Sequence, residues 1–114
     1  MSTEYAETAG RLLAVFEELE HLVTSKRNLA LDIAPLGAAS PATAVEAVIR
    51  NLPELVAQGA QRFRTSAAGD LDSYSVRMME LLTELDQHTP ADGTDFANAF
   101  AAGHAREMTA LQNN

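Results

Sequence analysis

Apolar residues recur every three or four positions along most of the chain, the spacing that places them on one face of an α-helix. The first such stripe consists of Tyr5, Ala9, Leu12, Phe16, Leu19, Leu22, Val23, Leu29 and Ala30. No proline interrupts it before Pro35. The pattern therefore predicts one long helix over residues 4–32, followed by a Pro- and Gly-containing loop that ends at Ser40.

The rest of the chain predicts shorter helices separated by turn residues. Ser40 and Pro41 are typical of a cap and first helical position, so a helix is expected over 41–51. Pro53 lacks an amide hydrogen, which predicts a break and a restart over 53–67. Two more apolar stripes predict helices over 71–87 and 94–111, on either side of a loop with Pro90 and Gly93.

No run of residues alternates between apolar and polar side chains, so no strand is expected. The sequence predicts an all-α fold: a small antiparallel bundle of four to five helices, with a long N-terminal helix and a Pro-broken second one. The 114 residues are read as a single domain, 1–114. A first helix this long would expose apolar side chains at one end. A second copy of the chain could bury them, which favours a homodimer.

Two glycines lie inside predicted helices, where each costs about 1 kcal/mol relative to alanine. Gly59 and Gly103 both have alanines nearby. A close approach of two helices would explain why glycine is present at these positions.

The composition bears on where the protein is located and on which kinds of chemical site it can hold. The chain has no cysteine, which excludes disulfides and thiolate metal sites. No apolar run approaches the roughly 20 residues of a membrane span. The N-terminus, MSTEYAETAG, lacks the basic and apolar regions of a secretory signal. We therefore expect a cytoplasmic protein that does not associate with a membrane, although export without a leader stays open.

The net charge of −8 is concentrated toward the C-terminus. Residues 70–114 hold eight acids and two bases, whereas residues 33–69 hold two acids and three bases. Nucleic-acid binding requires clustered Lys and Arg, and this chain has one lysine. No nucleic-acid partner is expected, and any electrostatic attraction would be toward a basic surface.

Glu18 and His21 have the E-x-x-H spacing of carboxylate-bridged metal bundles. Such bundles need a second E-x-x-H pair, which this chain lacks. Both residues also lie opposite the apolar stripe of the first helix. We therefore expect an ordinary polar helix face here, with no metal and no cofactor.

Catalytic signatures are absent from the sequence. It contains no G-x-S-x-G, no Gly-rich phosphate loop, no G-x-G-x-x-G and no H-E-x-x-H. Its histidines, at positions 21, 88 and 104, lie in or at the end of three different predicted helices. The protein is therefore not expected to be an enzyme.

Five residues of the C-terminal half are candidate partner contacts. His104 follows Phe100 by one turn and precedes Met108 by one turn, so all three share the apolar face of the last helix. His104 is either a partly buried histidine held by one hydrogen bond or a partner-contact or pH-sensitive position. Glu80 and Glu84 belong to the acidic C-terminal half that a basic partner would contact.

Three function classes follow from these observations. The leading one is a non-enzymatic protein-interaction module of the adaptor, chaperone or inhibitor type, which binds a protein through a helix face or its acidic C-terminal half. One alternative is a structural or leaderless secreted helical-hairpin protein that acts as an oligomer. The other is a metal-binding helical bundle.

Overall fold

The computed structural model describes residues 3–62 and 68–113. Its helices are α1 (Glu4–Thr24), α2 (Asn28–Ala39), α3 (Pro41–Arg62), α4 (Ala68–Leu85), the short 3-10 helix η1 (Thr94–Phe96) and α5 (Ala97–Gln112). The described residues form no strand. The predicted all-α bundle is confirmed.

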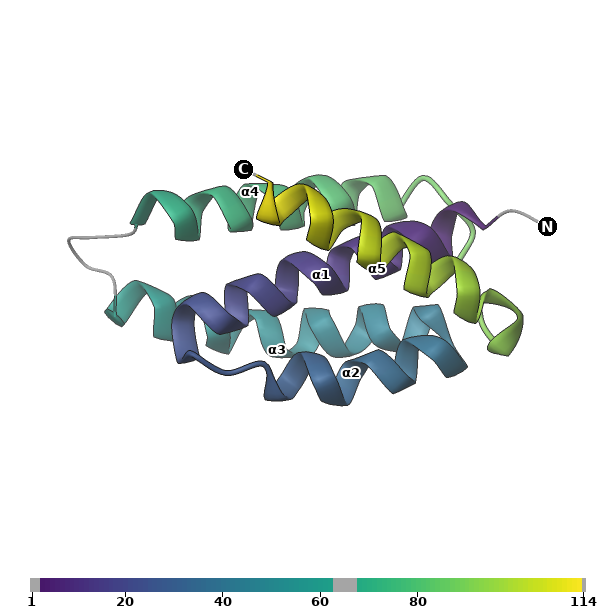
Figure 1. The fold of residues 1–114 in the computed structure, drawn as a ribbon, viewed down its shortest axis with the longest axis horizontal. Coiled ribbons are helices and arrows are strands. Elements are labelled where there is room, and N and C mark those ends of the chain that lie inside the picture. Colours follow the sequence, from purple (N-terminus) through teal and green to yellow (C-terminus); the bar gives the residue numbers. More distant parts are fainter. Residues whose placement is uncertain (1–2, 63–67, 114) are drawn as a thin grey trace.

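Helix α1 is the central element of the bundle. In the view of Figure 1, α4 lies above it, α2 and α3 lie below it, and α5 crosses it diagonally. The five consecutive residues from Leu12 to Phe16 are all at most 1% exposed, so α1 is buried around most of its circumference. A helix surrounded by others is expected to be apolar on more than one face, which the single predicted stripe did not capture.

The prediction of one helix over 4–32 is wrong, because the chain turns between α1 and α2. Ser25 has a left-handed backbone, with φ of 64°, and ends α1. The Thr24 hydroxyl accepts the amide hydrogen of Lys26 at 3.1 Å, which satisfies a donor in the turn. The chain then enters α2, so residues 33–39 are helical and not the predicted loop.

Helix α2 contains Pro35 and Gly37 and packs through a narrow buried edge. A Cβ built on Gly37 would lie 2.1 Å from the ring of Phe100 in α5. The missing side chain therefore lets the aromatic ring pack directly against the α2 backbone. Two sequence features that were interpreted as loop signals thus lie in a helix, one of them because it makes room for a core residue.

Helix α3 begins at Pro41, as predicted, with Ser40 before it. The predicted break at Pro53 is wrong, because α3 continues through it to Arg62. Val48 and Leu55 are both at most 2% exposed, so core contacts before and after the proline hold the segment helical. Residues 63–67, the end of the helix predicted over 53–67, lie outside the described residues.

The last two predicted helices are close to those observed. The helix expected over 71–87 is α4, followed by a hydrogen-bonded turn from Gln87 to Glu84. The helix expected over 94–111 begins as η1 and continues as α5. No helix in the described ranges combines the length and the apolar character that crossing a bilayer requires.

Two glycines bring α1 and α5 into backbone contact. A Cβ on Gly103 would lie 2.0 Å from the carbonyl oxygen of Glu7, and a Cβ on Gly10 would lie 2.0 Å from that of Phe100. The close approach expected at Gly103 is confirmed. Gly59 is also in tight contact, but with the side chains of Leu71 and Val23.

Helix α4 is the least enclosed of the long helices. Helix α2 contacts α1, α3 and α5, whereas α4 packs mainly on α1. Two grooves therefore flank α4, one toward α5 and the other toward α3. The lining of the first is mostly charged and polar, and that of the second is mostly apolar, with Asp86 and His88 at one end.

Candidate functional site

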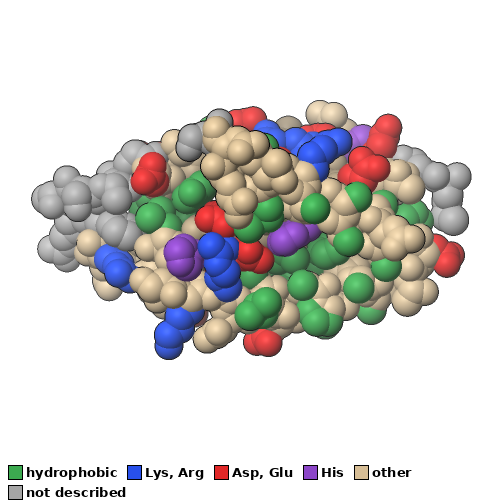
Figure 2. Space-filling view, in the orientation of Figure 1, with side chains coloured by type: hydrophobic (Ala, Val, Ile, Leu, Met, Phe, Trp, Pro, Cys, Tyr) green, Lys and Arg blue, Asp and Glu red, His purple; other side chains and the backbone are tan. Residues whose placement is uncertain are grey.

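Two adjoining hollows run between α4 and α5, and the first of them extends to the N-terminal end of α1. The first, of about 570 Å³, is lined by Glu4, Glu7, Thr8, Arg77, Glu80, Thr83, Glu84, Gln87, His88 and Arg106. The second, of about 520 Å³, is lined by Asp70, Ser73, Tyr74, Arg77, Glu80, Glu107, Ala110 and Leu111. They share Arg77 and Glu80, and we call them together the α4/α5 groove. Figure 2 shows acidic and basic side chains gathered along this upper edge of the molecule.

A buried ion cluster forms the floor of the α4/α5 groove. Glu107 of α5 is only 5% exposed. Arg77 of α4 donates to both of its carboxylate oxygens, from Nε at 2.9 Å and from Nη2 at 3.0 Å. Arg11 of α1 donates to the same carboxylate from Nε at 3.2 Å. One carboxylate therefore joins three helices.

The cluster keeps Glu107 ionised. Burial alone would raise the pKa of this carboxyl, but hydrogen bonds from Arg77 and Arg11 outweigh it and hold the pKa below its ordinary value. The hydrogen bond to Glu107 in turn raises the pKa of Arg77. The two-pronged contact of Arg77 is the geometry in which an arginine binds a carboxylate most strongly.

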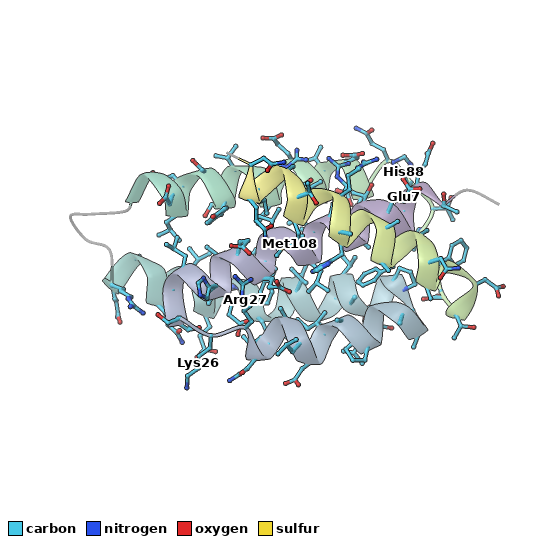
Figure 3. The ribbon with its side chains drawn as sticks, viewed as in Figure 1. Glu7, Lys26, Arg27, His88 and Met108 are labelled. Carbon is cyan, nitrogen blue, oxygen red and sulfur yellow. The ribbon has the colours of Figure 1, made fainter. Side chains whose placement is uncertain are left out.

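Carboxylates form the rim above this cluster. Glu80 contacts Arg77 at 3.3 Å, and Glu84 contacts Arg11 at 3.5 Å. The side chain of Glu80 is 58% exposed, so solvent and a ligand can reach it. At the far end, Glu4 Oε2 lies 3.1 Å from His88 Nδ1. Figure 3 shows Glu7 and His88 near each other at this end of α1.

The α4/α5 groove contains more acidic than basic side chains. Six carboxylates line it or its floor, and three arginines oppose them. The carboxylates are Glu4, Glu7, Asp70, Glu80, Glu84 and Glu107, and the arginines are Arg11, Arg77 and Arg106. Because Glu107 engages two of the three arginines, the rim presents negative charge to a ligand.

The structure separates the five predicted contact residues. Glu80 and Glu84 lie in the α4/α5 groove. Phe100 is 4% exposed and packs in the core against α2. His104 Nε2 lies 3.3 Å from Glu17 Oε1 of α1, so this histidine has an intramolecular hydrogen bond. Met108 is half-buried where α5 crosses α1 (Figure 3).

Glu18 and His21 occupy different environments. Glu18 Oε1 and Glu17 Oε2 each accept a hydrogen bond from Arg27 Nη1 at 2.8 Å, at the turn between α1 and α2. His21 is exposed. Within residues 3–62 and 68–113, no three His, Cys, Asp or Glu side chains come together as metal ligands would.

Sequence reasoning missed the cluster at the floor of the groove, although one signal was present. Glu107 follows Phe100 by seven residues, so it lies on the apolar face of the last predicted helix. A carboxylate at such a position requires buried cationic partners. Nothing in the sequence indicated which arginines they would be, since Arg11 is 96 residues away.

The chain matches no protein-family model, no curated protein and no solved structure.

Proposed function

We propose that this protein is a non-enzymatic interaction module whose α4/α5 groove binds a basic segment of a partner protein. The observation that carries the proposal is the acidic rim over a floor in which Glu107 already occupies Arg11 and Arg77. Lysine or arginine side chains of a partner would meet Glu80 and Glu84 without displacing this buried cluster. Complementary charge of this kind speeds association and selects the partner.

Exposed apolar side chains beside the rim give the same surface a non-polar component. Val76 and Met79 are 59% and 62% exposed on the outer side of α4. With Ser75, Glu80 and Thr83 they line a shallow hollow. Interfaces commonly combine an apolar centre with a charged rim, and methionine adapts to differently shaped partners. The partner segment should therefore be amphipathic as well as basic.

The test compares proteins captured by two matched variants from extract of the source cells. The groove variant is Glu80→Gln with Glu84→Gln, and the control is Glu46→Gln with Glu54→Gln on the exposed side of α3. We expect one protein to bind the wild type and the control but not the groove variant. Both double variants change the net charge equally, so an effect of net charge alone would weaken partner capture by the same amount in both.

The captured protein is then tested with a synthetic peptide, whose affinity is measured at several salt concentrations. A peptide covering the basic segment of the captured protein should bind in a fluorescence anisotropy titration, and the affinity should fall as salt is raised. Equal capture by both variants would contradict the proposal. So would an affinity that does not depend on salt.

A further inference from the structure

The groove on the other side of α4, toward α3, is apolar and contains a hollow of about 450 Å³. Its lining consists of Tyr5, Val45, Ile49, Leu82, Leu85, Asp86, His88 and Pro90. Ile49 is 49% exposed, although it lies beside the core residues Val45 and Leu85. A large aliphatic side chain in this position leaves apolar surface in water.

The apolar surface continues along both helices. On α3, Leu52 and Val56 follow Ile49 by three and seven residues, so they share its side of the helix, and both are half-buried. On α4, Leu82 lines the same hollow and is half-buried. We call Ile49, Leu52, Val56 and Leu82 the α3/α4 strip.

Charge decides which occupant suits this strip. Helix α3 carries two acids and two arginines and is neutral, whereas α4 carries four acids and one arginine. Two copies of a chain with net charge −8 repel each other unless they meet through surfaces that avoid opposing acids. A neutral α3 placed against the acidic α4 of another copy meets this condition.

Arg50 supplies the complementary charge. It follows Ile49 directly, is exposed, and makes no ion pair with the residues of its own chain that the structure describes. Asp72, near the start of α4, and Asp86, directly after its end, are also exposed and have no ion pair within the described residues. An arginine on α3 and carboxylates along α4 are thus left for contacts between chains.

We propose that a second copy of this chain docks on the α3/α4 strip, with α3 of each copy lying against α4 of the other about a twofold axis. The twofold axis repeats each contact, so a weakly complementary surface contributes twice to the free energy of association. The molecule measures 46 by 24 Å along its two longest axes. Such a face can supply the roughly 800 Å² per partner of a standard stable interface.

The first measurement is the oligomeric mass of the full chain as a function of concentration, by sedimentation or native mass spectrometry. We expect a mass of twice 12.2 kDa. Ile49→Asp should raise the dimer dissociation constant by about tenfold or more, because it places a charge in the apolar strip. Leu31→Asp is the matched control, since Leu31 is 65% exposed on α2, away from the strip.

A second pair of variants tests the charge pairing without touching the core. Arg50→Glu should also weaken the dimer by about tenfold, whereas Lys26→Glu, an equal charge reversal in the turn between α1 and α2, should not. Both positions are exposed, so both variants should fold, as circular dichroism would verify.

Several results would overturn the proposal. A wild type that stays monomeric at every concentration would do so, as would a dimer that Leu31→Asp breaks and Ile49→Asp does not. A dimer weakened by Ile49→Asp but indifferent to Arg50→Glu would contradict the placement of α3 against α4. This inference concerns the opposite side of α4 from the groove, so loss of partner capture and loss of the dimer are separate outcomes.

Discussion

The carboxylate of Glu20, in α1, accepts the backbone amide hydrogen of Ala30, in α2, at 3.0 Å. Its second oxygen accepts the amide hydrogen of Leu29 at 2.8 Å. Glu20 is 3% exposed, so a buried carboxylate of one helix caps the start of the next. The first amides of a helix have no partner inside it, and a negative charge there is also favoured by the helix dipole.

Replacing Glu20 with alanine should therefore loosen α2. The two amides would lose their acceptor in a site that excludes water, and we expect a loss of about 2 kcal/mol in the free energy of unfolding. Urea denaturation followed by circular dichroism measures the change. Asp32→Ala, an exposed substitution on α2, is the control and should cost less than about 0.5 kcal/mol. Equal effects of the two substitutions would show that Glu20 does not cap α2.

The same cap explains why the first helix was predicted too long. The turn at residues 25–27 contains no proline or glycine, and the apolar stripe continues through it. The turn is stabilised by the side chain of Glu20, in the preceding helix, and by the left-handed backbone of Ser25. A local pattern cannot reveal such a contact, whereas the predicted start at Pro41 depends only on neighbouring residues.

The candidate site, like the fold, could be predicted from the sequence only in part. Glu80 and Glu84 follow from the charge distribution, which is visible in the sequence. The groove they line depends on α4 and α5 both packing on α1, with Arg77 and Glu107 paired across the space between them, a tertiary arrangement without a local signal. Phe100 and His104 share a helix face with Met108, as predicted, but that face packs against α1 and α2.

Gly103→Ala should destabilise the protein. At an exposed helical position this change would stabilise by about 1 kcal/mol. Here the new Cβ would meet the backbone of Glu7, which cannot move aside without separating α1 from α5. We expect a net loss of about 2 kcal/mol, seen as a lower Tm in a thermal melt. Gly59→Ala is the control, because its Cβ would meet flexible side chains, and its Tm should change little. A Gly103→Ala protein as stable as the wild type would refute backbone contact at this crossing.

Pro53→Ala should stabilise the protein, because Pro53 lies inside the continuous helix α3 and is exposed. Alanine restores a backbone donor and relieves the clash with the preceding turn, which together outweigh the lost rigidity of the unfolded chain. We expect a gain of about 1 kcal/mol or more in urea denaturation. Pro90→Ala, in the exposed segment between α4 and α5, should give no gain. A loss of stability at position 53 would mean that the core requires a proline-bent α3.

Glu107→Gln tests the ion cluster through its pH dependence. At neutral pH the variant should be about 2 kcal/mol less stable than the wild type, because a neutral amide replaces the carboxylate that accepts hydrogen bonds from the charged Arg77 and Arg11. The pKa of Glu107 is lower in the folded than in the unfolded chain. Its stabilisation is therefore fully present above the ordinary glutamate pKa of about 4.3, and it is lost as the pH falls through the lowered folded value.

The measurement is the difference in unfolding free energy between wild type and Glu107→Gln, from urea titrations at a series of pH values. That difference should be constant near neutrality and shrink in acid, while the difference for the exposed Glu46→Gln control stays small throughout. Comparing two proteins at each pH removes the acid response common to all other carboxylates. A difference that does not change with pH would mean that Glu107 contributes through its shape and not its charge.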